Sequence, residues 1–179
     1  MQLRNRLLLL ATLLTVGIFT TLHAQDDKSK RPSPLVEAKA TVGDVNVSIV
    51  YGSPAVKGRK IWGALVPYGE VWRTGANEAT TFEVSKDVEI EGQKLPAGKY
   101  ALFTIPGEKE WTIIFNKEAS QWGAYNYKKD QDALRVTVKA DKAKPANERM
   151  TFKIDEKSGK VTLLWENVAV PFTVKAAKA

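Results

Sequence analysis

Apolar residues that recur at every second position are the feature that most constrains the fold of this chain. Two such segments, 36–42 and 45–49, alternate valine, alanine and isoleucine with polar residues and are separated by Gly43-Asp44. A period of two predicts half-buried β-strands, and the Gly-Asp pair predicts a tight turn between them. The same pattern recurs at 82–84, 88–90, 134–138, 150–154 and 168–174. No long amphipathic helical stretch follows residue 24, so the chain is predicted to be all-β.

Three further segments are apolar on both faces. Residues 100–105 and 111–115 are joined by the turn PGEKE, and 161–166 follows the turn at Ser158-Gly159. Such runs are typical of strands in the centre of a domain. About ten short strands without helical crossovers indicate a single antiparallel β-sandwich, with a jelly roll as one arrangement of it. Pro171 marks the last strand as an edge strand or a bulged one, because proline cannot donate to a β-ladder.

The first 24 residues match the three parts of a secretory signal peptide. Arg4 and Arg6 precede an apolar run at 7–19, and Ala24 ends the short segment that follows. We therefore expect cleavage after Ala24, no membrane span after that cleavage, and a periplasmic or secreted location. A retained membrane anchor is the alternative, although the apolar run is short for a bilayer span. The remaining chain is predicted to contain a flexible leader at 25–34, a sandwich domain at 35–175 and a tail at 176–179.

Histidine and cysteine are both missing from the predicted mature chain. The sequence has no cysteine, and its single histidine, His23, lies in the predicted signal peptide. Zinc and copper sites rely on these side chains, and the commonest general bases are imidazoles. We therefore expect no metal ligand set, no cofactor and no disulfide. A calcium site built only from oxygens stays open, but the chain lacks the spaced acidic loop that would indicate one.

The chain is mildly basic, with a net charge of +7 that falls to +5 once Arg4 and Arg6 are removed. A nucleic-acid-binding protein would need basic residues gathered on one face of a recognisable module, and the sequence indicates neither. We therefore expect no nucleic-acid partner. Such a charge keeps a protein soluble or attracts it loosely to an anionic envelope surface.

Two long connections, 52–70 and 117–131, carry glycine, aromatic and basic residues together. Connections of this length are uncommon in a compact domain and are usually functional. The first continues into GEVWRTGANEAT, where Arg73 is a cation able to bind a carboxylate or phosphate through paired hydrogen bonds. The residues predicted to wall or orient a ligand with it are Trp72, Asn77, Glu78, Arg59, Trp62, Tyr68, Trp122 and Tyr125.

A structural interpretation of the same residues stays open. Arg73 and Glu78 can form an ion pair that holds the turn, and the loop aromatics can cap the open end of the core. The functional interpretation predicts that loops 52–70, 72–78 and 117–127 gather at one end of the sandwich, with Arg73 facing a pocket. Aromatic faces with a polar rim suit a small anionic or carbohydrate-like ligand. Trp111 and Trp165 lie within predicted strands and are expected in the core.

A non-catalytic module that binds a small molecule is the function that these features favour. The alternative is a carboxylate-dependent hydrolase or isomerase that uses Glu78 with Glu70 or a lysine. A purely structural envelope protein, which needs no pocket, is the third. Serine-nucleophile motifs and glycine-rich phosphate loops are missing from the sequence.

Three long segments resemble those of a bacterial exported family catalogued as domain of unknown function 2911. They are KGRKIWGALVPYGEVWRTGANEAT, LPAGKYALFTIPGEKEWTIIFNKE and QWGAYNY, and the resemblance extends over roughly residues 33 to 174. It implies a stand-alone exported domain. It implies no activity, ligand or catalytic residue, so the candidate site depends on the residues themselves.

Overall fold

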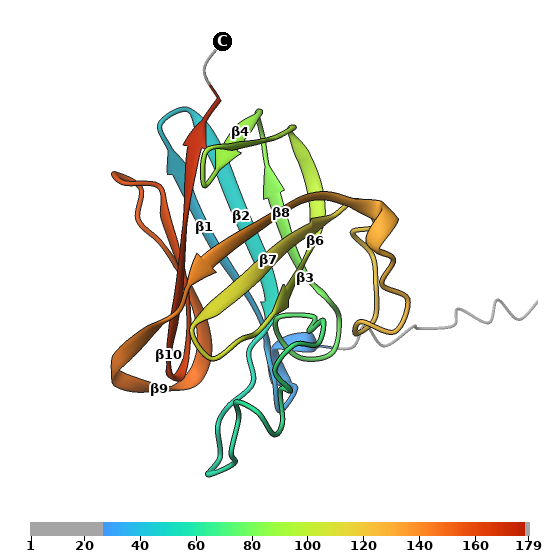
Figure 1. The fold of residues 1–179 in the computed structure, drawn as a ribbon, viewed down its shortest axis with the longest axis vertical. Coiled ribbons are helices and arrows are strands. Elements are labelled where there is room, and N and C mark those ends of the chain that lie inside the picture. Colours follow the sequence, from blue (N-terminus) through green and yellow to red (C-terminus); the bar gives the residue numbers. More distant parts are fainter. Residues whose placement is uncertain (1–26, 178–179) are drawn as a thin grey trace, which may run out of the picture.

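The computed structural model describes residues 27–177, which form a sandwich of two antiparallel β-sheets. Figure 1 shows the strands, with the predicted signal peptide outside the described residues. The larger sheet contains β1 (Leu35–Val42), β2 (Val45–Gly52), β3 (Thr80–Val84), β6 (Gly98–Ile105), β7 (Glu110–Asn116) and β8 (Asp132–Lys139), in that order. The smaller sheet has the order β5 (Gln93–Leu95), β4 (Val88–Ile90), β10 (Lys160–Ala176) and β9 (Asp141–Ile154). The prediction of an all-β antiparallel sandwich is confirmed.

Short 3-10 helices are the only helical elements in residues 27–177. They are η1 (Lys28–Lys30), before β1, and η2 (Lys129–Gln131), before β8.

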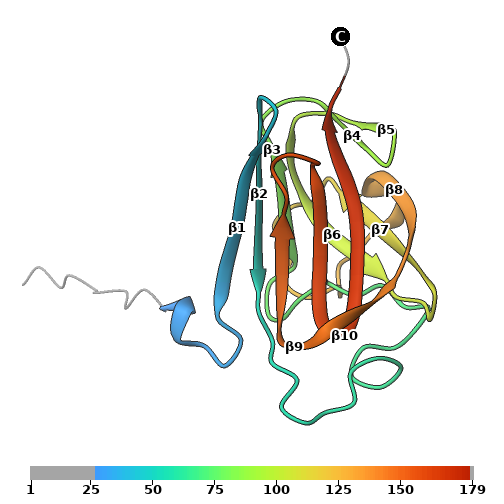
Figure 2. The same ribbon diagram turned by 90° about the vertical axis from the view of Figure 1, so that its left-hand side faces the viewer.

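Neighbouring strands of the larger sheet are mostly consecutive in the sequence. The β4–β5 hairpin is an excursion to the smaller sheet, after which β6 returns to pair with β3. The order is that of a meander, which differs from the jelly-roll arrangement. The larger sheet also curves, so that β1 contacts β9 at one edge and β8 contacts β5 and β10 at the other (Figure 2).

The predicted hairpins are present in the structure. β1 and β2 pair from Leu35 opposite Gly52 to Val42 opposite Val45, with Gly43-Asp44 as the turn. Gly43 has a φ of 63°, which glycine adopts without the strain that a side chain would add. β6 and β7 pair as the predicted central hairpin.

The C-terminal hairpin is longer than the sequence pattern predicts. The sequence pattern predicts separate strands at 161–166 and 168–174. The structure has the single strand β10 over both, because a bulge at Glu166, with a φ of 51°, connects the two segments. Pro171 lies between the last residue paired with β9, Ala169, and the first paired with β4, Val174. Its missing N–H therefore removes no bond from either ladder. β9 begins at Asp141, nine residues before the predicted strand at 150–154. Its first part lies at the edge of the smaller sheet and is rich in charged residues, so the alternation of apolar and polar residues is weak there.

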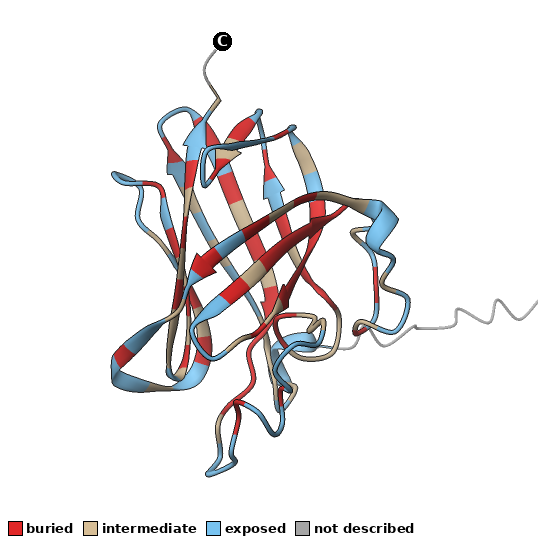
Figure 3. Ribbon diagram, in the orientation of Figure 1, coloured by how far each residue is buried: buried red, intermediate tan, exposed pale blue. Residues whose placement is uncertain are grey.

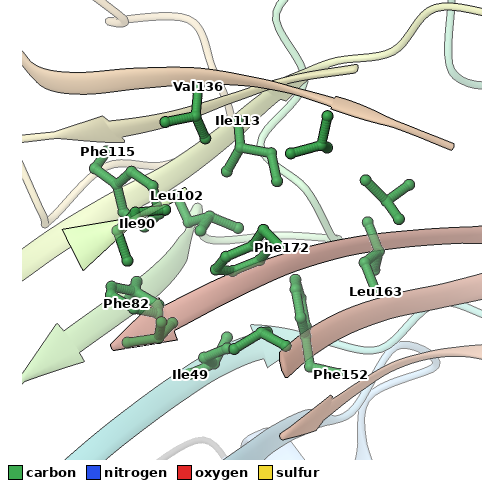
Figure 4. Packing of buried hydrophobic residues seen from close by; sticks show 14 of the residues in the cluster. Ile49, Phe82, Ile90, Leu102, Ile113, Phe115, Val136, Phe152, Leu163 and Phe172 are labelled. Atoms are coloured by element: carbon green, nitrogen blue, oxygen red, sulfur yellow. The ribbon is translucent and has the colours of Figure 1, made fainter. Parts of the chain in front are cut away.

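The main core lies between the two sheets, and strands such as β2, β8 and β10 bury alternate residues in it (Figure 3). Phe172 of β10 packs against Phe82 and Phe115 of the larger sheet, with ring centroids 6.2 and 6.1 Å away. Figure 4 shows aliphatic side chains from both sheets filling the space around these rings. Burying each such side chain contributes roughly 1.5 to 3 kcal/mol, so this layer is the main source of stability.

A second, smaller core lies on the outer face of the larger sheet. Its centre is formed by Ala101, Phe103 and Ile114, which belong to β6 and β7. The connections 71–79 and 117–131 cover these residues with Val71, Ala79, Ala124 and Tyr127. This second burial explains why both faces of β6 and β7 are apolar in the sequence. It also fixes the two connections to the face of the sheet.

Candidate functional site

Four of the five tryptophans meet at one end of the main core. Trp62 and Trp72 come from the long connection before β3, whereas Trp111 belongs to β7 and Trp165 to β10. Their ring centroids lie 5.0 to 6.3 Å apart in contacting pairs, and Trp72 stacks on Trp165 with 17° between the planes. Trp111 and Trp165 are each 1% exposed, as expected for core residues. Trp62, at 8% exposed, closes this end of the core.

Two indole N–H groups of this tryptophan cluster lack a hydrogen-bond acceptor. They are the buried Nε1 atoms of Trp62 and Trp165. The Trp62 and Trp165 rings meet edge to face, with 83° between their planes. In such a pair the edge of one ring faces the π-electrons of the other, which partly offsets the cost of an unmet N–H. The cluster is therefore held by packing rather than by hydrogen bonds.

An open cleft of about 900 Å³ lies against the tryptophan cluster. Four separate segments line it, which are 60–68, 107–111, 139–142 and 166–168. Ile61, Trp62 and Trp111 are its buried residues, and Tyr68 is its exposed aromatic ring. The lining combines an apolar base with a half-exposed aromatic face, which is the usual character of a small-molecule site.

Charged side chains of both signs surround the cleft. They are Lys60, Lys109, Lys139, Lys142, Glu108, Glu110, Asp141 and Glu166. Within residues 27–177, none of the eight makes an ion pair or a side-chain hydrogen bond. Their hydrogen-bonding groups are therefore available to a ligand. Because four cations face four anions, the cleft has no net charge that would select a strongly anionic ligand.

The predicted ligand-binding residues are divided between two regions of the molecule. Trp62 and Tyr68 line the cleft, and Trp72 packs behind Trp62 with 6.0 Å between ring centroids. Trp122 lies instead opposite Glu78 in a single β-bridge beside the outer core. The described structure thus brings some of the predicted residues together and separates the others.

Asn77, Tyr125 and Arg59 lie outside the cleft lining. Asn77 and Tyr125 belong to the two connections that cover the outer core, and Asn77 Nδ2 donates to the carbonyl of Ser33 at 3.4 Å. Arg59 holds its own loop, because its guanidinium donates to the carbonyls of Val56 and Ala55 at 3.1 and 2.6 Å. Its role is therefore structural in this arrangement.

Arg73 lies beside the cluster in sequence but does not line the cleft. Its neighbours Trp72 and Thr74 are directed into the main core, where Thr74 Oγ1 donates to Thr104 Oγ1 at 3.0 Å. The Nε atom of Arg73 is buried without an acceptor, and the considered ion pair with Glu78 does not form.

Glu78 is bound by the leader instead. Lys28 Nζ lies 2.8 Å from Glu78 Oε1, and Arg31 Nη1 donates to both carboxylate oxygens at 3.1 and 3.0 Å. Partial burial raises the pKa of Glu78, but these hydrogen bonds outweigh it and lower the pKa from 4.5 to about 2. A carboxylate held ionised between two cations is unsuited to act as a general acid at neutral pH.

Sequence reasoning missed most of the cleft. The residues at 107–110 and 139–142 belong to turns and strand ends, whereas 166–168 belong to the bulge within β10, and the three segments are far apart in the sequence. Charged residues at strand ends are common, so nothing in their types indicated a shared site. The lysine and arginine that bind Glu78 were likewise hidden in a charged leader.

Replacing Glu78 with glutamine is expected to lower the free energy of unfolding by about 1 to 2 kcal/mol at neutral pH. A carboxyl whose pKa is lowered on folding contributes stability above its unfolded pKa. That contribution is lost as pH falls through the folded value, here between 4.5 and about 2. Urea unfolding across this pH range should therefore show the wild type and the variant converging in acid.

Glu83→Gln is the matched control for this prediction. Glu83 pairs with Lys99 at 3.6 Å across two strands, but both side chains are about half exposed. Exposed pairs contribute little, so this variant should unfold almost like the wild type at every pH. Equal losses in the two variants, or a Glu78→Gln loss that persists unchanged in acid, would contradict the assigned role of Glu78.

The fold and the cleft together define a small β-sandwich domain with a charged cleft, based on aromatic rings, at the end of its core. The chain belongs to the family described as protein of unknown function (DUF2911), whose model matches residues 33–174. This confirms the resemblance seen in the sequence. Searches of curated proteins and of solved structures give no significant match.

Two further properties concern residues 27–177 only. None of their helices has the length and apolar character needed to span a membrane. No three of their carboxylate, histidine or cysteine side chains lie together as ligands for a metal ion.

Proposed function

We propose that this protein is an exported, non-catalytic module that binds a small carbohydrate-like ligand in the cleft beside the tryptophan cluster. The observation that carries the proposal is the lining of the cleft, in which an apolar base is surrounded by eight charged side chains without partners. Export rests on the signal-peptide pattern of residues 1–24.

The charge balance of the cleft favours a neutral, hydroxyl-rich ligand over an anionic one. A hydroxyl group both donates and accepts hydrogen bonds, so it can use lysine ammonium groups and carboxylates alike. An anion would meet Glu108, Glu110, Asp141 and Glu166 as well as the lysines. Arg73, the cation considered for anion binding, is outside this lining.

Tyr68 is the ring that supports an aromatic contact with a sugar. It is 41% exposed and packs against Gly63, where a Cβ atom would lie 3.0 Å from its Cε2. Because that glycine has a φ of 71° and no side chain, it leaves room for the ring. One face of Tyr68 is thus supported by backbone while the rest remains available for stacking on the apolar face of a sugar.

Thermal unfolding in the presence of neutral mono- and oligosaccharides tests the proposal, with organic acids and phosphate as competing classes. A sugar at about a hundred times its Kd should stabilise the protein by about 2.7 kcal/mol and raise Tm by roughly 5 to 10 °C. Tyr68→Ala should weaken binding at least about tenfold while leaving the unliganded Tm nearly unchanged.

Tyr125→Ala is the control, since Tyr125 is a more exposed aromatic outside the cleft. It should bind the sugar like the wild type. No stabilisation by any neutral sugar, or stabilisation only by anions, would reject a carbohydrate-like ligand. Equal weakening by Tyr68→Ala and Tyr125→Ala would reject the cleft as the binding site.

A further inference from the structure

Trp122 and Tyr125 are the most exposed large apolar side chains of residues 27–177, at 56% and 84%. Both lie on the connection between β7 and β8. An exposed tryptophan followed closely by an exposed tyrosine is costly in water unless a partner covers them. Their exposure therefore indicates an interaction surface distinct from the cleft, whose lining contains neither residue.

The backbone that carries these two rings is firmly held. The N–H of Ala79 donates to the carbonyl of Gln121 at 2.9 Å, and the N–H of Gly123 donates to that of Asn77 at 3.1 Å. Tyr127 packs on Phe103 in the outer core, with 5.1 Å between ring centroids. A fixed backbone keeps the aromatic rings at the surface instead of letting the loop fold over them.

Tyr125 itself is supported by a glycine. A Cβ atom on Gly123, which has a φ of 65°, would lie 2.8 Å from Tyr125 Cε2. The ring therefore lies directly over the Gly123 backbone while remaining open to solvent. The local sequence thus favours presentation of this ring at the surface.

Basic residues occur on the segments next to the exposed pair. Glu78 lies opposite Trp122 in the β-bridge, and bridged residues project their side chains to the same side. The ion pairs of Glu78 with Lys28 and Arg31 therefore hold the leader beside Trp122. Residues 27–31, Glu78 and the connection 117–131 together contain six basic and four acidic side chains. The basic ones are Lys28, Lys30, Arg31, Lys117, Lys128 and Lys129.

We propose that this aromatic–basic surface, formed by Trp122, Tyr125 and the six basic residues, binds the headgroup region of an anionic lipid bilayer. Tryptophan and tyrosine are the aromatic residues that favour the boundary between lipid and water. Lysine and arginine beside them are attracted to anionic lipids. An aromatic pair whose neighbouring segments carry more basic than acidic side chains matches this boundary better than it matches an apolar protein groove.

The direct test is binding of the protein to lipid vesicles. The protein is used in the form that cells accumulate, and its N-terminus is established by intact mass. Co-sedimentation should show binding to vesicles of phosphatidylglycerol and phosphatidylcholine in equal parts, and much weaker binding to phosphatidylcholine alone. Added salt should weaken the binding. Tryptophan fluorescence should shift to the blue, and the shift should report Trp122 because the other four tryptophans pack in the core.

Replacing Trp122 and Tyr125 together with alanine should weaken binding to the anionic vesicles at least about tenfold. Replacing Lys128 and Lys129 with glutamate should weaken it as well and reduce its salt dependence. Tyr68→Ala, at the cleft, should bind vesicles like the wild type. Since both aromatic residues are exposed, the double variant should keep the wild-type Tm, which separates loss of binding from loss of folding.

Several results would overturn the proposal. They are the absence of binding to either kind of vesicle, equal binding to neutral and anionic vesicles, and undiminished binding by the Trp122 and Tyr125 double variant. Retention of the protein on purified peptidoglycan without vesicle binding would assign the surface to a cell-wall glycan and reject a lipid surface. None of these results bears on sugar binding in the cleft, which Tyr68→Ala tests separately.

Discussion

Replacing Trp165 with alanine is expected to lower the free energy of unfolding by about 3 to 5 kcal/mol. Trp165 is 1% exposed and contacts Trp62 and Trp72, with ring centroids 5.6 and 5.8 Å away. Removal of the indole leaves a cavity under the cleft that the surrounding strands cannot fill, because β9 pairs with β10 on both sides of Trp165, at Leu164 and Glu166. Urea unfolding monitored by circular dichroism measures the loss without depending on tryptophan fluorescence.

Trp165→Phe is the comparison that separates packing from hydrogen bonding. Phenylalanine keeps much of the ring volume and removes an indole N–H that has no acceptor. Loss of packing contacts destabilises the variant, whereas removal of the buried, unpaired N–H stabilises it. The expected loss of unfolding free energy is therefore below about 1.5 kcal/mol. A Trp165→Phe loss as large as that of Trp165→Ala would mean that the indole N–H makes an essential hydrogen bond, contrary to the packing described here.

Replacing Gly52 with alanine is expected to cost about 2 to 3 kcal/mol, because the new methyl group has no space. A Cβ atom on Gly52 would lie 2.2 Å from the carbonyl oxygen of Ala76, and that oxygen belongs to backbone that cannot rotate away as a side chain would. The N–H of Ala76 also donates to the carbonyl of Gly52 at 3.2 Å. The substitution should therefore displace the 75–78 segment and weaken the contact of the leader with Glu78.

Gly58→Ala provides the matched substitution in an open position. Gly58 has a φ of 68° but no atom within 4 Å of its added Cβ, so only the backbone conformation is strained. The expected cost is about 1 kcal/mol. Thermal or urea unfolding of both variants compares the two causes directly. A larger loss of unfolding free energy in Gly58→Ala than in Gly52→Ala, or no loss in Gly52→Ala, would show that the close approach of residues 52 and 76 does not limit the side chain at position 52.

The division of the predicted site residues has a physical cause in the second core. Apolar residues on the outer faces of β6 and β7 require cover, and the connections 71–79 and 117–131 supply it. Trp122 and Tyr125 are therefore held on the face of the larger sheet. Trp62 and Tyr68 lie at the end of the main core, where the connection 52–70 crosses it. Loops of similar composition thus have different positions because they bury different apolar surfaces.

Local patterns in the sequence were sufficient to predict the class of fold and much of its detail. The alternation of residues 36–49, with Gly43-Asp44 between its two halves, specifies a hairpin whose strands and turn the structure confirms. The apolar segments 100–105 and 111–115 specify the β6–β7 hairpin. These features depend on neighbours within a few positions, since side-chain direction alternates with a fixed period along a strand. Trp111 and Trp165 were predictable as core residues for the same reason.

The tertiary structure alone decided which residues share a surface. The cleft joins segments near residues 62, 109, 140 and 167, and only the strand order and curvature of the two sheets bring them together. Glu78 pairs with Lys28 and with Arg31, which is 47 positions away, rather than with the nearby Arg73. A local pattern specifies how each strand is buried, but it carries no information about which strand ends meet. Which segments come together depends on how the strands pair and the two sheets pack over the whole chain. The set of residues in the candidate site depends on the same packing.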